Sequence, residues 1–299
     1  MELGATDEIR FYVDPTDHNG LVVGDRDFGD NPAIPRIEVA IRWLDWVVRG
    51  IDTGIKDEPP IKMFTMGSNQ WQLADGWPPS QAKYTDYYLH SDGSHHRTLS
   101  TEMPGEEQPL GYAYDPEDPV PTLGGNHSGP QDHPEVIRVG ALDQRPNWKR
   151  EDVLVFVTPP LDEDVEVTGP IQLRLFAASS APDTDFIGRL IDLPPDGPAY
   201  NITEGIIRAR FRESVWEPPQ LIEPGKVYEY AIDLQPTSNV FKKGHRICLH
   251  VTSSSFPMWD RNPNTGAEQG MDTRLEVAEQ TIYHDAERAS RIVLPVIAQ

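Results

Sequence analysis

The 299-residue sequence has a single cysteine, Cys248, so no disulfide can form within the chain. It has no run of roughly 18 apolar residues, the length that a membrane-spanning helix requires. Basic residues are scarce: 26 Lys and Arg stand against 48 Asp and Glu, for a net charge of −22. Such a surface repels phosphate backbones and anionic lipids, so we expect binding to neither nucleic acid nor membranes. The lone cysteine and the absence of a signal-like start predict a cytoplasmic location.

The sequence also lacks G-x-S-x-G, the nucleophile motif of α/β-type serine hydrolases, whose glycines allow a sharp strand-to-helix turn. No serine has a glycine two residues before it. Ser253, Ser254 and Ser255 form a run at the end of a predicted strand, and we expect their hydroxyls to bond the backbone nearby. Cys248 lies in that strand without an activating base, which predicts a packing role.

The N-terminal segment predicts one strand and one helix. Residues 9–13 (IRFYV) are typical of a short strand, and a helix is expected to begin at Asn31-Pro32 and to end at Gly50. Its apolar stripe consists of Ile34, Ile37, Ile41, Leu44 and Val48. One strand and one helix cannot bury both of their faces, so residues 1–58 are predicted to be the trailing piece of an α/β unit.

Residues 59–299 show a different pattern, in which short segments alternate between apolar and polar side chains. Examples are Ile171–Ala177, Ile207–Phe211, Tyr228–Leu234 and Arg246–Val251, separated by turn signals such as PPDG and EPGK. Alternation with a period of two is typical of strands with one face in a core and one in water. The sequence therefore predicts a mainly β fold, an antiparallel β-sandwich of the jelly-roll type.

Three long stretches carry a family resemblance: DTDFIGRLIDLPPDG at 183–197, IDLQPTSNVFKKGHRI at 232–247 and CLHVTSSSFPMWDRNPN at 248–264. They resemble the C-terminal half of the Xaa-Pro dipeptidyl-peptidases, cocaine esterase and α-amino-acid ester hydrolases, which are serine hydrolases of the CocE/NonD type. The resemblance implies that residues 1–58 are the end of an α/β-hydrolase domain. It implies a galactose-binding-like jelly roll over residues 59–299, and no cofactor.

The resemblance also implies a role for His18. In this family the general-base histidine follows a strand in a G-P-W-x-H segment, and a D-F-G turn and a helix come next. Here DPTDH ends at His18, with Asp14 and Thr16 in place of the family's Gly and Trp, and DFG follows at 27–29. His18 is thus the implied triad base. The family's triad aspartate precedes the histidine by more residues than are present here, and Asp14 and Asp17 are too close in sequence to replace it.

The chain alone is therefore expected to be inactive. As part of a serine hydrolase it would need an N-terminal α/β-hydrolase fragment, or it would associate with itself through residues 9–50. A small ester or peptide substrate would bind only to the complete enzyme. The alternative is a non-catalytic jelly roll that binds a carbohydrate or a protein. Exposed tryptophans would serve it: Trp71, Trp77, Trp148, Trp216 and Trp259.

Two further groups of residues have side chains that could form a site. The loop histidines have no spacing typical of zinc ligands, so no metal is predicted there; they are His95, His96, His127 and His133. Arg208, Arg210 and Arg212 would share one strand face, and we expect them to pair with carboxylates rather than to form an anion site.

Overall fold

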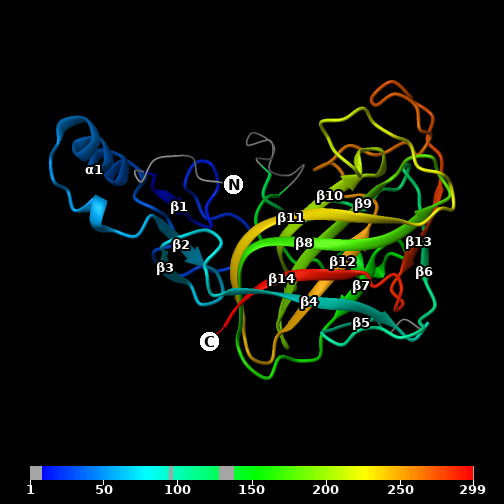
Figure 1. The fold of residues 1–299 in the computed structure, drawn as a ribbon, viewed down its shortest axis with the longest axis horizontal. Coiled ribbons are helices and arrows are strands. Elements are labelled where there is room, and N and C mark those ends of the chain that lie inside the picture. The colour runs from blue at the N-terminus through cyan, green and yellow to red at the C-terminus, as the bar shows by residue number, and fades with distance from the viewer. Residues whose placement is uncertain (1–8, 94–96, 128–137, 299) are drawn as a thin grey trace.

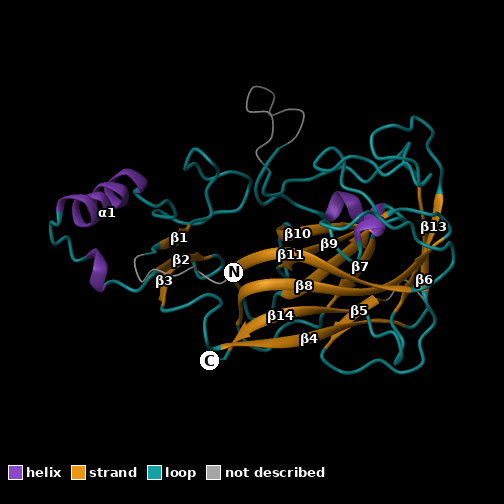
Figure 2. Cartoon of the chain, turned by 45° about the horizontal axis from the view of Figure 1, so that its top comes forward, coloured by secondary structure: helices purple, strands orange, loops and turns teal. Residues whose placement is uncertain are grey.

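The computed structural model describes residues 9–93, 97–127 and 138–298. The chain forms a large β-sandwich and a small three-stranded sheet that carries the long helix α1 at the opposite side of the molecule (Figure 1). Figure 2 shows that helix is confined to the N-terminal segment and to a few short turns. The predicted mainly β class is confirmed.

The sandwich is one hydrogen-bonded sheet folded over itself, with the order β10-β9-β12-β7-β5-β4-β14-β8-β13-β6 and β11 paired to β8. Its pairs are antiparallel except for a single parallel contact between β5 and β7. The strands are β4 (Ala82–Ser91), β5 (Arg97–Ser100), β6 (Leu110–Tyr114), β7 (Leu154–Val157), β8 (Val165–Ser179), β9 (Asp185–Leu193), β10 (Tyr200–Arg208), β11 (Tyr228–Phe241), β12 (Arg246–Thr252), β13 (Ala278–Tyr283) and β14 (Arg291–Ile297). Two short 3₁₀ turns flank them, η2 (Arg145–Lys149) and η3 (Ala209–Phe211).

The long strands β8 and β11 follow the predicted alternation. Along β8, Ile171, Leu173 and Leu175 are fully buried, whereas Gln172, between the first two, is exposed. The ring of Tyr230 in β11 packs against Phe186 in β9 with 4.8 Å between ring centroids. The core therefore lies between the β8–β11 layer and the β9–β12 layer, as the period-two pattern predicts.

Strand β12 differs from the prediction, because it is buried on both faces. The alternation along Arg246–Val251 places His250 on the polar face, yet its side chain is as fully buried as that of Cys248, for which packing is expected. The turn η2 covers this face: the indole Nε1 of Trp148 donates to Nε2 of His250 at 2.7 Å. Alternation along one strand cannot reveal that a segment about a hundred residues away covers its outer face.

The small sheet is built from β1 (Phe11–Val13), β2 (Ile61–Thr65) and β3 (Gln70–Ala74), with β2 between the other two. Strand β1 is parallel to β2, and the crossover between them holds α1 (Arg36–Arg49) and the turn η1 (Ile55–Asp57). The change from the small sheet to the large one therefore falls between β3 and β4, C-terminal to the domain boundary expected at residue 58. The domain boundary between residues 58 and 59 stays a prediction.

Helix α1 begins later than expected. Pro35 occupies the N-cap and the helix starts at Arg36 rather than at Asn31, whereas Gly50 ends it in the left-handed conformation, with φ of 68°. No residue of α1 is buried, although the whole helix is described. Ile37 and Val48 are 77% and 73% exposed, so much of the apolar stripe is left uncovered by the described residues.

We predict that His250 makes the fold less stable in mild acid. Burial, together with nearby Arg189, lowers its pKa well below 6.5, whereas the unfolded chain takes up a proton near that pH. The unfolded state then holds one proton more, so the unfolding free energy falls as the pH drops below about 6.5, by up to about 1.4 kcal/mol per pH unit. Urea denaturation from pH 7.5 to pH 5 should show this slope reduced in His250→Gln, which keeps an acceptor for Trp148.

The matched control is His18→Gln, which removes an exposed histidine and should leave the slope unchanged. Equal slopes in the wild type and in His250→Gln would show that His250 does not carry this pH dependence.

Candidate functional site

His18 lies at the tip of a tight loop that follows β1 directly. The carboxylate of Asp17 accepts hydrogen bonds from the backbone N–H groups of Asn19 at 2.9 Å and Leu21 at 2.8 Å. The Leu21 hydrogen bond lowers the pKa of Asp17. Gly20 turns the chain back with φ of 78°, a conformation that suits glycine. This local geometry places the His18 side chain in solvent.

Arg36, in the first turn of α1, forms hydrogen bonds that hold this loop in place. Arg36 donates from Nη1 to the backbone oxygen of His18 at 2.8 Å and from Nη2 to Oγ1 of Thr16 at 2.8 Å. The carboxylate of Asp14 accepts from the hydroxyl of Thr16 at 2.6 Å and from the N–H of Ile34 at 2.9 Å. Asp14 is thus committed to the loop, and no carboxylate of the described residues bonds the imidazole of His18.

The far end of the loop is fixed to the sandwich. Gly24 pairs with Ala141, and the N–H of Asp25 donates to the oxygen of Ala141 at 2.8 Å. Both Gly24 and Gly140 have positive φ, and a Cβ on either would collide with backbone of the other segment. Two glycines therefore permit the close approach of the histidine loop to the sandwich.

Arg26, which is buried, also attaches the histidine loop to the sandwich. Its guanidinium is buried, and Nη2 donates to Oδ1 of Asn239 at 2.9 Å and lies 3.4 Å from Asp192. Burial lowers its pKa, and Asp192 offsets part of that effect. Asn239 itself pairs with Met66, the residue directly after β2, so one residue of β11 contacts both the histidine loop and the small sheet.

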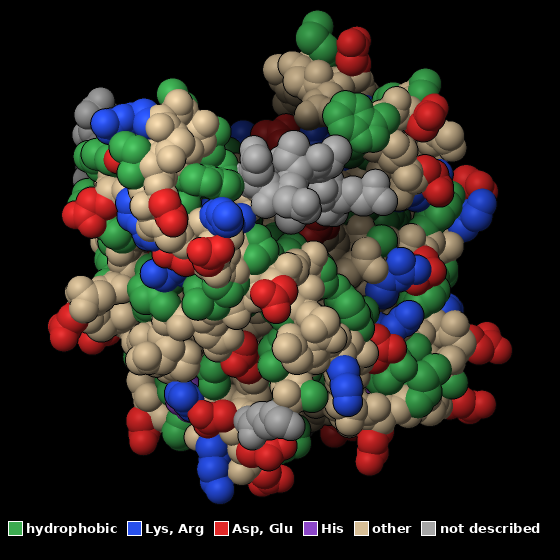
Figure 3. Space-filling view, turned by 60° about the vertical axis from the view of Figure 1, so that its left-hand side comes forward, with side chains coloured by type: hydrophobic (Ala, Val, Ile, Leu, Met, Phe, Trp, Pro, Cys, Tyr) green, Lys and Arg blue, Asp and Glu red, His purple; other side chains and the backbone are tan. Residues whose placement is uncertain are grey.

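An open groove lies beside the histidine loop, between β1 and α1. Its volume is about 750 Å³, and its walls are mainly apolar, with Tyr12, Val39, Trp43 and Leu44 among the lining residues. Figure 3 brings this side of the molecule forward and shows hydrophobic side chains interspersed with charged ones. Strand β1 is at the edge of the small sheet, and helices normally cover the faces of parallel sheets, so a further parallel strand beside β1 would extend the sheet next to this groove.

The serine run does not form a nucleophilic site. Ser253, Ser254 and Ser255 are all buried. The hydroxyl of Ser254 accepts from the N–H of Val120, as the expectation of backbone bonding requires. The other two differ from that expectation, because Ser253 bonds the hydroxyl of Tyr112 and Ser255 accepts from Arg189. Cys248 is buried as predicted, and burial raises the pKa of its thiol.

The arginine trio pairs with carboxylates, as expected. Arg208 contacts Asp185, Arg210 contacts Asp183, and Arg212 lies near Glu213. The expectation that they share one strand face was wrong, because β10 ends at Arg208 and the chain continues as η3.

Among the loop histidines, His95, His96 and His133 lie outside the described residues. Within the described ranges, no group of three or more His, Cys, Asp or Glu side chains is placed to hold a metal ion. The same residues contain no helix that is long and apolar enough to cross a membrane.

Sequence reasoning missed the residues that brace the histidine loop, chiefly Arg26, Arg36 and Asn239. Arg26 precedes the DFG turn, and this is the one local signal that could have drawn attention to it. Its partner Asn239 is 213 residues away, so their contact could not be inferred from spacing.

Comparison with known proteins decides the family. The profile described as the X-Pro dipeptidyl-peptidase C-terminal non-catalytic domain matches residues 53–293. The chain belongs to this family. It is 40% identical to the cocaine esterase of Rhodococcus sp. (strain MB1 Bresler) over 305 residues, which cover 97% of this chain and 52% of that protein.

Solved structures agree with this assignment. An aminopeptidase from a marine sediment Thaumarchaeota archaeon matches 88% of this chain and 44% of its own, with a TM-score of 0.77 and 32% identity. An α-amino acid ester hydrolase matches with a TM-score of 0.73 and 29% identity, over 85% of this chain and 44% of its own. The chain thus corresponds to the C-terminal part of these proteins and spans about half of their length.

We predict that Arg26→Met weakens the attachment of the histidine loop. Asp192 and Asn239 would lose a buried donor, which should lower the unfolding free energy by about 1–3 kcal/mol. The control is Arg49→Met, whose exposed pair with Asp45 should contribute less than about 0.5 kcal/mol.

Urea denaturation measures both variants, and hydrogen exchange reports whether residues 23–28 open more readily in Arg26→Met. Equal stability losses for the two variants would contradict a structural role for Arg26.

Proposed function

We propose that this chain is the C-terminal part of a serine hydrolase that cleaves esters or Xaa-Pro amides, and that it has no hydrolase activity alone. It supplies His18 as the general base, while an N-terminal α/β-hydrolase part supplies the serine, the oxyanion hole and the triad aspartate. In the complete enzyme His18 takes the proton of the serine hydroxyl and returns it to the leaving group.

The position of His18 is the observation that carries this proposal. Its side chain is exposed on a loop that is fixed both to α1 through Arg36 and to the sandwich through Arg26. The loop is held in place, and the His18 side chain has no hydrogen-bond partner among the described residues. This is what we expect of a base whose serine is supplied by another part of the enzyme. The absence of G-x-S-x-G from the sequence supports the requirement for a second part.

The groove beside β1 is the proposed docking site of the N-terminal part. It lies next to Asp14 and Arg36, which also brace the histidine loop, so a sheet that filled it would approach His18. Leu44 lines the groove and is 54% exposed, so completing its burial would contribute about 1 kcal/mol, roughly half of the value for a fully exposed leucine. A second copy of the chain, docked through residues 9–50, is the competing occupant.

We also propose a cytoplasmic location. A single buried cysteine suits a reducing compartment, because the fold takes no stability from a disulfide.

If the serine and His18 come from different parts of the enzyme, a fluorophosphonate probe should leave the isolated chain unlabelled. After mixing with an N-terminal fragment of a related esterase that carries G-x-S-x-G, the fragment's serine should be labelled and ester hydrolysis should appear. His18→Ala in the C-terminal chain should abolish this activity, because most of the rate enhancement requires the base. Asn19→Ala is the control in the same loop.

A labelled serine in the isolated chain would refute the absence of a nucleophile. Full activity of the His18→Ala mixture would refute the role of His18.

The docking site is tested by charge insertion in the groove. Leu44→Asp should weaken association with the N-terminal fragment by more than roughly tenfold, because a carboxylate replaces an apolar side chain of the groove and loses its hydration on docking. Val215→Asp, which also replaces an exposed aliphatic residue but lies outside the groove, should not change it. Analytical ultracentrifugation of dilute mixtures measures both, and dimerisation of the chain alone that Leu44→Asp abolishes would instead identify a second copy as the occupant.

A further inference from the structure

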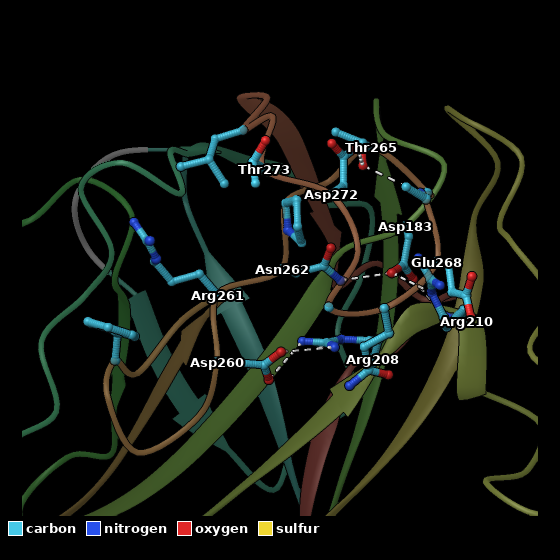
Figure 4. A pocket seen from close by; sticks show the side chains of 17 residues that line it. Asp183, Arg208, Arg210, Asp260, Arg261, Asn262, Thr265, Glu268, Asp272 and Thr273 are labelled. Atoms are coloured by element: carbon cyan, nitrogen blue, oxygen red, sulfur yellow. Dashed lines mark hydrogen bonds and ion pairs between the residues drawn. The ribbon is translucent and has the colours of Figure 1, made fainter.

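A second pocket lies on the sandwich, in the part of the molecule far from α1 and the groove. It has a volume of about 420 Å³ and is formed mainly by the connection between β12 and β13, closed from below by the end of β10 and by η3. Figure 4 shows the charged and amide side chains of both segments that line it. This volume lies within the range of roughly 300–1,000 Å³ that is typical of small-molecule sites.

Arg210 forms the floor of this pocket and is not fully paired. It is only 8% exposed, and its backbone N–H and its Nε donate to the two carboxylate oxygens of Asp183 at 2.9 and 2.8 Å. The two terminal nitrogens donate to no atom of the described residues. These nitrogens are not among the buried polar atoms of the described residues that lack a partner, so they are open to the pocket and can donate to a ligand that accepts hydrogen bonds.

The walls offer acceptors. Asp260 is held in place by Arg208, whose Nη1 and Nη2 donate to its two oxygens at 3.4 and 3.2 Å. Arg208 in turn donates two hydrogen bonds of 2.9 Å to buried Asp185, so Asp260 is positioned by a side chain that is itself fixed. Glu268 also lines the pocket and is exposed, and its carboxylate accepts no hydrogen bond from the described residues.

One wall is aromatic. The ring of Phe256 is 40% exposed, and the guanidinium of Arg261 lies 5.3 Å from its centroid. This contact orients the ring and leaves part of its surface open to the pocket. None of the tryptophans considered from the sequence lines this pocket; Trp148 instead bonds His250, and Trp71 donates to the backbone oxygen of Asn31.

The combination of charges restricts the ligand. An anion would meet the carboxylates of Asp260 and Glu268, whereas a cation would meet Arg210. Asp272 is already paired with Arg274, and Arg261 donates to the backbone oxygen of Pro116. A neutral molecule with many hydroxyls can accept from Arg210, donate to the carboxylates and place its C–H face on an aromatic ring. We propose that this pocket binds a neutral saccharide of one or two sugar units.

In this complex the Arg210 terminal nitrogens donate to ring or hydroxyl oxygens, Asp260 and Glu268 accept from hydroxyls, and Phe256 contacts an apolar sugar face. The site is independent of the proposed hydrolase function, because it needs neither His18 nor an N-terminal part.

Saturation-transfer NMR on the isolated chain tests the proposal, with glucose, galactose, mannose, maltose, cellobiose and lactose as probes and calorimetry for the affinities. At least one probe should bind. Glu268→Gln and Phe256→Ala should each weaken it by roughly tenfold, because a charged hydrogen bond or the aromatic contact is lost. Both residues are exposed, so these substitutions test the site without breaking the buried Arg210–Asp183 pair.

The matched controls are Glu217→Gln and Trp216→Ala, which change an exposed glutamate and a 91% exposed aromatic residue outside the pocket. They should leave the affinity unchanged. The proposal is refuted if no saccharide of the panel binds, if the pocket and control variants behave alike, or if acetate or inorganic phosphate binds at Arg210 while the saccharides do not.

Discussion

The buried contact between Arg26 and Asn239 lies where the two parts of this molecule are joined. Arg26 comes from the histidine loop and Asn239 from the long strand β11, and their hydrogen bond is buried. The same stretch of β11 receives the N–H of Met66, which donates to the oxygen of Ser238 at 3.0 Å. The small sheet and the loop of His18 are therefore positioned by a strand of the sandwich rather than by each other alone.

The two parts differ in how far they satisfy their own packing requirements. The sandwich encloses a continuous core between its layers, with side chains such as Leu173, Phe186 and Tyr230 fully buried. The small sheet has three strands and an α-helix with no buried residue, and its edge strand β1 pairs only with β2. Most of the folding free energy must therefore come from the sandwich, which serves as the rigid support for the histidine loop.

Features that depend on local pattern could be predicted from the sequence, and those that depend on distant covering segments could not. Alternation in β8 and β11 identified their inward faces, and Gly50 marked the end of α1 because a left-handed residue is required there. The outer face of β12 was misjudged because Trp148, which covers His250, is remote in sequence. His18 could be singled out only by resemblance, since nothing in its own segment indicates the restraints that Arg26 and Arg36 impose.

The single cysteine has a practical consequence. Cys248 lies in the centre of β12, packed against Ile191 and Ala199 on the face that η2 covers, and burial raises its thiol pKa. A thiol in this state is neither accessible nor appreciably ionised, so alkylating reagents can reach it only in molecules whose sandwich has opened. The rate at which Cys248 is alkylated therefore measures how often the sandwich opens. It reports that event without an introduced label.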